Sequence, residues 1–291
     1  MLFVPQTLSS VLLAVLPLKA ESANRFFSVS SLSFSEWLTN SILVSVLVVG
    51  LVLLFARQST VRLRMVPGGL QNLFEIVVET TYEAIEGIVG PHIAKKSFGF
   101  LASLFLFILF SNWFGLLPGV GTIGWGPKSG FMTVSEVEVP LLRPTTADLN
   151  MTLGLAVISM CFWFVWTVQE VGFFGLIKDL FEVKGGVKGV ILILLVPLFL
   201  FVGVLEVISI LIRPVSLSLR LYGNVYAGES LLHTMINLGQ TLNLPEWVAK
   251  VLSVLVPTPF YFLELLIGFL QAMVFMLLVA VYLQLSTVHA K

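Results

Sequence analysis

The chain has 291 residues, of which 57% are hydrophobic and only 11% are charged, and its 16 basic and 16 acidic residues cancel. A mean hydropathy of +1.02 together with 24 phenylalanines excludes an ordinary soluble domain and is typical of an all-α polytopic membrane protein. Because the net charge is zero and no basic cluster alternates with aromatic residues, the sequence gives no support for a nucleic-acid partner.

An apolar run extends from Leu8 to Leu18, but it is too short to span a bilayer and has no basic region ahead of it. We therefore predict an N-terminal extension over residues 1–34 rather than a cleavable signal peptide. The first span is expected from Ser35 to Ala56, because about 22 residues form about 33 Å of helix, enough to cross the hydrocarbon core. Residues 35–291 are predicted to form a single membrane domain.

A helix of a different kind is predicted between Pro67 and Gly90. Acidic residues recur at helical spacing on one side, and apolar residues occupy the other. The acidic residues are Glu75, Glu79, Glu83 and Glu86, and the apolar ones are Leu70, Phe74, Val77, Val78, Ile85 and Ile88. This pattern indicates an amphipathic helix along the membrane surface. Since its polar face is acidic, contact with other proteins is as plausible as contact with lipid headgroups.

Two more spans are predicted from Ser97 to Pro118 and from Asn150 to Phe174, separated by a loop rich in Gly, Pro and Thr. The single cysteine, Cys161, lies in the third span and can form no internal disulfide, so we interpret it as a small buried hydrophobic residue. The sequence contains neither a metal-ligand set nor a phosphate-binding loop. We therefore expect no metal and no cofactor.

The last two apolar segments are too long for upright spans. Residues 189–238 stay mostly apolar, and as one helix this segment of about 50 residues would measure about 75 Å, more than twice the membrane thickness. It either folds into a short hairpin or lies strongly tilted. The final segment, from Val248 to Leu285, has about 38 residues and is again too long. The chain is thus expected to have five spans and one surface helix.

The positively charged residues predict the orientation. With the N-terminus outside, nine cations fall on the cytoplasmic side and five on the outer side, in agreement with the positive-inside rule. The nine are Arg57, Arg62, Arg64, Lys95, Lys96, Lys178, Lys184, Lys188 and Lys291, and the five are Lys19, Arg25, Lys128, Arg143 and Lys250. We therefore predict that the N-terminus lies outside and the C-terminus inside.

Polar side chains within the two long segments are the candidate functional residues, because a charge at the centre of a bilayer costs about 3 kcal/mol to insert. They are Arg220, Glu206, Asn224, Glu229, His233, Glu264 and Gln271. An arginine can also snorkel to a headgroup or pair with a local acid, and one histidine alone is more often structural. The combination of acids, an arginine, a histidine and amides on two segments favours a functional site, since each charge adds its own insertion cost.

Helical spacing divides these candidates between two sides of the fourth segment. Glu206, Arg213, Arg220 and Asn224 fall within about 40° of one another on a helical projection. Glu229 and His233 point to the opposite side, while Glu264 and Gln271 share one face of the last segment. The pattern predicts two polar routes, one near Glu206 and one near Glu229, His233 and Glu264, with Arg220 between them.

Several motifs carry a family resemblance across most of the chain. They are Pro67-Gly-Gly-Leu-Gln-Asn-Leu, Leu106-Phe-Ile-Leu-Phe-Ser-Asn112, Pro144-Thr-Thr-Ala-Asp-Leu-Asn150, Arg213-Pro-Val-Ser-Leu-Ser-Leu-Arg-Leu-Tyr-Gly-Asn-Val-Tyr-Ala-Gly-Glu229 and Leu270-Gln-Ala-Met-Val-Phe275. With these motifs the chain resembles subunit a of the rotary F-type ATP synthases, the stator of a membrane-embedded proton motor. The Arg-Leu-x-Gly-Asn-x-x-Ala-Gly-Glu block with a downstream Gln-Ala is the most specific of them.

The resemblance implies roles for the candidate residues. Arg220 corresponds to the essential stator arginine of the family. Asn224, Glu229 and Gln271 correspond to polar residues of its aqueous half-channels, and Glu206 belongs to the opposite half-channel. Family members carry Glu or His at the position of Glu229 and commonly His or Glu at that of Glu264. Here both are Glu, with His233 one turn beyond Glu229, so the usual pairing of an acid with an imidazole is rearranged.

The resemblance also implies an architecture and partners. Two strongly tilted helices would form a hairpin at residues 189–288 against a c-ring of proteolipid subunits. The chain would be a non-catalytic subunit, with subunit b of the peripheral stalk and the rest of the F1Fo ATP synthase as partners in the lipid bilayer. The Pro-Thr-x-Ala-Asp-Leu-Asn stretch looks bacterial, which favours a bacterial plasma membrane over an organellar inner membrane.

Two other functions stay open on the residues alone. A secondary transporter also buries charges, but we find neither inverted repeats nor paired interrupted helices in corresponding halves of the sequence. A membrane-embedded enzyme such as a protease needs a nucleophile with a base or a metal set. Three scattered histidines and one cysteine do not provide one.

Overall fold

The computed structural model describes residues 40–61, 65–117, 120, 124–125, 139–140, 142–181, 190–242 and 244–288. The apolar run from Leu8 to Leu18 and the predicted extension over residues 1–34 lie outside these residues. Within them the fold is helical apart from two short strands, β1 (Gly124–Trp125) and β2 (Val139–Pro140), which pair antiparallel. The expected all-α fold is confirmed.

Five helical segments are long and apolar enough to cross a membrane, by length and composition. The first three are α3 (Asn40–Thr60), α5 (Pro91–Gly115) and α6 (Leu149–Val171). The fourth is α8 (Val190–Ile236), and the fifth combines α10 (Glu246–Leu255) with α11 (Pro257–Val288). The chain is therefore a polytopic membrane protein with the five spans that the sequence predicts.

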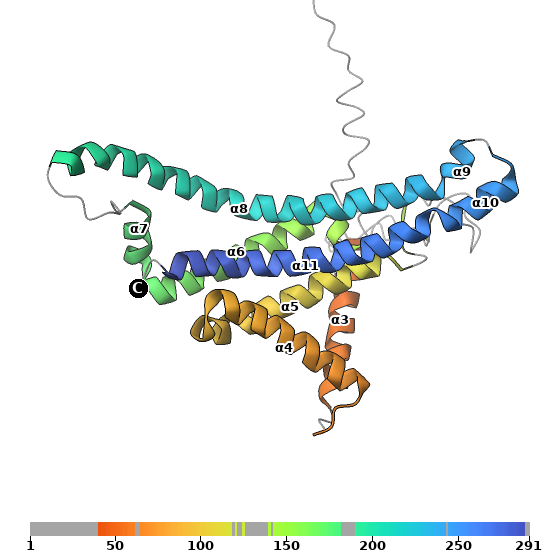
Figure 1. Cartoon of the computed structure of the whole chain (residues 1–291), viewed down its shortest axis with the longest axis horizontal. Coiled ribbons are helices and arrows are strands. Elements are labelled where there is room, and N and C mark those ends of the chain that lie inside the picture. The colour runs from red at the N-terminus through yellow and green to blue at the C-terminus, as the bar shows by residue number, and fades with distance from the viewer. Residues whose placement is uncertain are drawn as a thin grey trace, which may run out of the picture.

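The fourth segment is one continuous helix of 47 residues, so the hairpin within it that the sequence left open is wrong. At 1.5 Å per residue α8 is about 70 Å long and must tilt steeply in a hydrocarbon core of about 30 Å. Pro197 and Pro214 each remove one backbone hydrogen bond without ending the helix, as membrane helices tolerate. Figure 1 shows α8 and α11 running together across the direction of α3, joined through α9 (Leu238–Thr241) and α10.

The predicted amphipathic helix is α4 (Gly69–Val89). Its buried side, which includes Ile85 and Val89, joins the core that α5 and α11 form. Glu75, Glu79 and Glu83 lie on the exposed side. Leu70, near the start of the helix, is also exposed, so the first turn of α4 presents apolar surface that this chain does not cover.

Two glycines let consecutive helices change direction without a long loop. Gly90 separates α4 from α5, and Gly172 separates α6 from α7 (Phe173–Phe181). Both have a φ of 79°, a conformation that disfavours any residue with a Cβ atom. Pro91 follows Gly90 in the first turn of α5, where its missing N–H leaves no hydrogen bond unmade.

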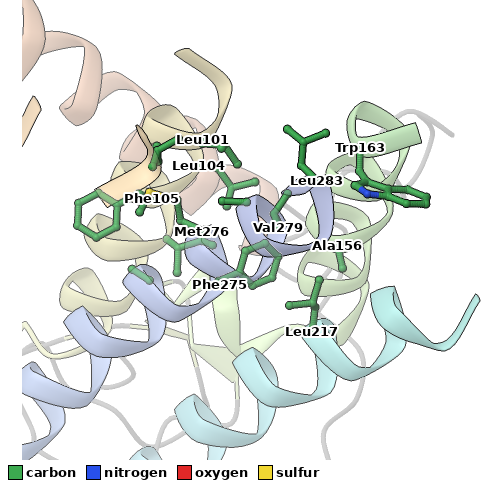
Figure 2. Close-up of a cluster of buried hydrophobic side chains, with 14 of the residues drawn as sticks. Leu101, Leu104, Phe105, Ala156, Trp163, Leu217, Phe275, Met276, Val279 and Leu283 are labelled. Carbon is green, nitrogen blue, oxygen red and sulfur yellow. The ribbon is translucent and has the colours of Figure 1, made fainter. Parts of the chain in front are cut away.

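The core lies where α5, α6, α8 and α11 meet (Figure 2). Its labelled members are Leu101, Leu104 and Phe105 of α5, Ala156 and Trp163 of α6, Leu217 of α8, and Phe275, Met276, Val279 and Leu283 of α11. Phe275 is fully buried. Ala272 and Ala280, also fully buried, allow the backbone of α11 to approach its neighbours closely, which is how helices associate where lipid is as apolar as the core.

Arg213 of α8 packs against two aromatic rings at the edge of this core. Its guanidinium carbon lies 5.7 Å from the centre of the Trp163 ring and 4.7 Å from that of the Tyr282 ring. Trp163 Nε1 in turn donates a hydrogen bond to the carbonyl oxygen of Tyr282 at 2.9 Å. Cation–π contacts are worth roughly 0.5–2 kcal/mol. They join α6, α8 and α11 at this point and place the charge of Arg213 against two aromatic faces.

Cys161 lies exposed on α6, so its interpretation as a buried residue was wrong. The inward side of α6 carries Ala156, Met160 and Trp163, and Cys161 points away from it. In a membrane span an apolar side chain gains little from burial in protein, because lipid surrounds it with an equally apolar environment. Apolar character alone therefore did not predict which side of the helix Cys161 occupies.

Replacing Phe275 by Ala tests this core. An apolar side chain gains little free energy on moving from lipid into the protein core, so the loss of stability comes mainly from the cavity that the smaller side chain leaves. We expect about 2 kcal/mol of destabilisation. Thermal unfolding of the detergent-solubilised chain measures it. Phe262→Ala is the matched control, because Phe262 lies on the same helix and is 72% exposed. Equal losses in the two variants would contradict this description of the core.

Candidate functional site

A pocket lies where the C-terminal end of α5, the turn before α6, and the facing parts of α8 and α11 meet. Its empty space, together with the part open to solvent, is about 440 Å³, and its polar lining comes from Asn112, Asn224, Glu229, Glu264 and Gln271. The pocket thus brings together four of the seven candidates that the sequence analysis selected: Asn224, Glu229, Glu264 and Gln271. The helical projection had put Asn224 and Glu229 on opposite sides of α8, yet both reach this pocket.

Hydrogen bonds between side-chain amides and neighbouring groups fix the walls of the pocket. Asn224 Nδ2 donates to Gln271 Oε1 at 2.7 Å and so connects α8 to α11. Asn112 Nδ2 donates to the carbonyl oxygen of Gly268 at 3.1 Å, and the neighbouring Trp113 Nε1 donates to that of Leu265 at 3.1 Å. Within the described part of the chain, Asn112 Oδ1 and Gln271 Nε2 are buried without a hydrogen-bond partner. These atoms offer water places to bind, since buried water occupies polar pockets.

The two acids of the pocket come from different helices and lie close together. A Cβ atom at Gly228 of α8 would collide with the Glu264 carboxylate of α11, so this carboxylate occupies space that only glycine leaves open. Gly228 directly precedes Glu229, and the charges of Glu229 and Glu264 interact. The pocket therefore holds a carboxylate pair, and such pairs tend to titrate as one unit.

Arg143 is a cation near the pocket that the sequence analysis did not select. It precedes Pro144, which lines the pocket, and its charge acts on Glu229 and on Tyr222 of α8. No sequence signal pointed to it, because it lies in a loop far from α8 along the chain. Asn112 was also missed, although an amide inside an apolar span was a usable signal.

The other three candidates lie outside the pocket. Arg220 is exposed on α8, one turn before Asn224, and within the residues described here it forms no hydrogen bond or ion pair. Glu206 is exposed about 21 Å from Arg220 along the helix. His233 is exposed too, and its Nδ1 lies 3.4 Å from Asn237 Nδ2.

Arg220 stands at the edge of an uncovered surface of α8. Only 6% of the most apolar window of residues 197–236 is buried in this chain. Ser216 and Ala227, which flank Arg220 on the helical surface, are exposed small residues. This side of α8 must therefore meet lipid or another protein.

Comparison with known proteins places the chain in a family. The family profile described as ATP synthase A chain matches residues 38–284. ATP synthase subunit a of Protochlamydia amoebophila (strain UWE25) is 32% identical over 246 residues, 84% of this chain and 79% of that protein. The protein of the same name from Geotalea uraniireducens (strain Rf4) is 31% identical over 253 residues, 87% of this chain and 90% of that protein.

A third relative is named for its ion. ATP synthase subunit a, sodium ion specific, of Propionigenium modestum is 31% identical over 232 residues, 78% of this chain and 67% of that protein. The matches span nearly all of the described helices, including α8 and α11. The chain therefore belongs to the ATP synthase A chain family, the membrane subunit a that its motifs resemble.

Proposed function

We propose that this chain is the ion-conducting stator of a rotary F-type ATP synthase. It forms two half-channels against the c-ring, and proton flow through them turns the ring and drives ATP synthesis in partner subunits. Family membership supports the proposal. The observation that carries it is Arg220, an exposed arginine on an apolar helix, without a partner in the described chain and one turn from a polar pocket.

In this proposal Arg220 meets a carboxylate of the c-ring where the two half-channels approach each other. A guanidinium group does not lose its proton in a protein, so Arg220 cannot relay protons itself. Its fixed charge keeps the ring carboxylate ionised and blocks direct leakage between the channels. Arg213 cannot take this role, because its guanidinium lies against the rings of Trp163 and Tyr282.

The pocket forms the outer half-channel. Under the predicted orientation it lies on the outer side of the membrane, where α5 ends and α6 begins. Glu229 and Glu264 exchange protons, and the amides of Asn224 and Gln271 hold water between these acids and Arg220. His233 lies beyond Glu229 toward the outer end of α8 and contributes at the entrance. The pocket thus offers titratable groups spaced along a route from the outer surface to the ring.

Glu206 serves the inner half-channel. It lies on the uncovered part of α8, toward the cytoplasmic side in the predicted orientation. A proton released from the ring leaves past Glu206. The two half-channels are thus separated along α8 by the segment that carries Arg213 and Arg220.

The remaining parts of the proposal concern assembly. The hairpin of α8 with α10 and α11, over residues 189–288, packs against the c-ring, and the ring covers the open side of α8. Subunit b and the rest of the F1Fo ATP synthase complete the complex in a bacterial plasma membrane. The chain itself is not an enzyme, because ATP is made in the soluble sector.

Replacing Arg220 tests the central role. Arg220→Ala should abolish proton-driven ATP synthesis in vesicles, while the detached soluble sector still hydrolyses ATP. Arg220→Lys should also fail, because a desolvated lysine can lose its proton and lacks the planar fork. Arg57→Ala removes an exposed arginine at the end of α3 and should leave synthesis unchanged. Normal synthesis by the Arg220→Ala complex would overturn the proposal.

A double-mutant cycle tests the outer route. Glu229→Gln and Glu264→Gln should each slow proton-driven synthesis and change its pH dependence, because each leaves one carboxylate without its neighbour. The double variant should lose less than the sum of the two single losses, since neighbouring groups that act as a unit are not additive. Strictly additive losses would show that the two acids work independently.

Cysteine labelling tests the inner route. In a Cys161→Ser background, cysteines at Glu206 and Ser216 should react with a membrane-impermeant thiol reagent added on the cytoplasmic side. Removal of Cys161 is necessary because this native thiol is exposed. A cysteine in place of Phe275, which is fully buried, is the unreactive control. Reaction from the outer side alone would reverse the assignment of the two half-channels.

A further inference from the structure

Arg143 lies outside the long helices and has no place in the two half-channels described so far. We infer that Arg143 is the fixed counter-charge of the carboxylate pair in the pocket, where its charge favours the ionised form of Glu229 at the outer entrance. This inference rests on the proposed function of the pocket, and it makes Arg143 a positioning residue rather than part of the proton path.

The turn that carries Arg143 is anchored in the protein. Pro144 packs so closely on α5 that a Cβ atom at Gly115 would lie 2.8 Å from Pro144 Cγ. Thr145 and Thr146, in the 3-10 turn η2 (Thr145–Ala147), are fully buried. Ser45 Oγ of α3 donates a hydrogen bond to Thr145 Oγ1 at 3.5 Å. Arg143 therefore starts from a fixed backbone position, which a free loop would not provide.

The same turn is fixed on its other side by the start of α6. Asp148 accepts hydrogen bonds from the backbone nitrogen of Asn150 at 3.0 Å and from its Nδ2 at 3.2 Å, which caps the helix. η2 also contacts α8, the helix that carries Glu229. The turn thus lies wedged between α3, α5, α6 and α8, and it presents Arg143 next to the pocket lined by Pro144.

The charges around Glu229 show what Arg143 balances. α11 contributes the acid Glu264, and the turn before α6 contributes Arg143. α5 faces the pocket with Asn112, an uncharged amide. On α8, Tyr222 stacks on Tyr226 with ring centres 5.9 Å apart, and Tyr222 interacts with Arg143, Glu229 and Asp148, the cap residue of α6.

Without Arg143, ionising both acids would place two uncompensated negative charges in the pocket. The pair would therefore retain a proton strongly. A nearby cation favours the ionised form of a carboxylate. With Arg143 present, the pair can therefore release a proton toward the ring at a lower outer pH than it could without this cation. The pH at which the outer route works is then set in part by a residue outside the membrane helices.

The test uses the complete ATP synthase in vesicles, with the membrane potential clamped and the pH varied only on the side that the pocket faces. Arg143→Gln should shift the pH profile of ATP synthesis upward by about one unit, the lower end of the effect of an opposite charge at close range. Arg143→Lys should restore most of the wild-type profile because it keeps the charge. In a Glu229→Gln background, Arg143→Gln should cause no further shift.

Lys250→Gln is the matched control, since it removes an exposed cation that pairs with Glu246 in the same hairpin, away from the pocket. Its profile should not move. An unmoved profile in Arg143→Gln would overturn the inference. So would loss of assembled complex in both the Gln and the Lys variants, because that result assigns Arg143 to folding. Arg220→Ala in the same vesicles distinguishes failure of the two proposals. ATP synthesis by Arg220→Ala would reject the stator role. Absence of synthesis by Arg220→Ala, together with an unmoved pH profile of Arg143→Gln, would reject only the role of Arg143.

Discussion

The cost of placing charge in hydrocarbon governs how this protein is built. Arg213 lies against two aromatic rings, the acids of the pocket lie among amides, the charge of Arg143 acts on Glu229, and Lys96 pairs with Glu170 where α5 and α6 approach each other. Arg220 and Glu206 on α8 are the exceptions, because both are exposed and neither has a partner in the described chain. A membrane helix that leaves one arginine without a partner needs a counter-charge from another molecule, and this need connects the fold to the proposed ring contact.

Close packing of helices positions the site. The small residues Gly228, Gly268 and Ala272 bring α5, α8 and α11 near enough for side chains to reach across: the Glu264 carboxylate fills the space beside Gly228, and Asn112 bonds to the backbone at Gly268. Between helices in a bilayer, such packing and hydrogen bonding replace the hydrophobic effect as the source of association. The same contacts therefore stabilise the fold and enclose the pocket.

The length of α8 separates the two ends of the proposed route. One helix of 47 residues carries Glu206, Arg213, Arg220 and Glu229 in succession, and only its second half meets the pocket. Residues 197–212 of α8 stay largely uncovered. A short upright helix would not offer both an enclosed polar region and an open apolar surface of this extent. The steep tilt is thus a structural requirement of the arrangement as well as a consequence of length.

The sequence by itself determined the membrane class, the five spans, the amphipathic helix α4 and the family, because apolar runs, helical periodicity and the Arg220 motif are local properties of the chain. It also selected four of the residues that meet in the pocket. Tertiary structure decided what local patterns do not encode: that residues 190–236 form one helix, that Cys161 faces outward, that Arg213 turns toward Trp163 and Tyr282, and that the charge of Arg143 acts on Glu229. A helical projection gives the direction of a side chain about its own axis. Which neighbour that side chain meets depends on how separate helices pack, and this packing brings together residues far apart in the sequence.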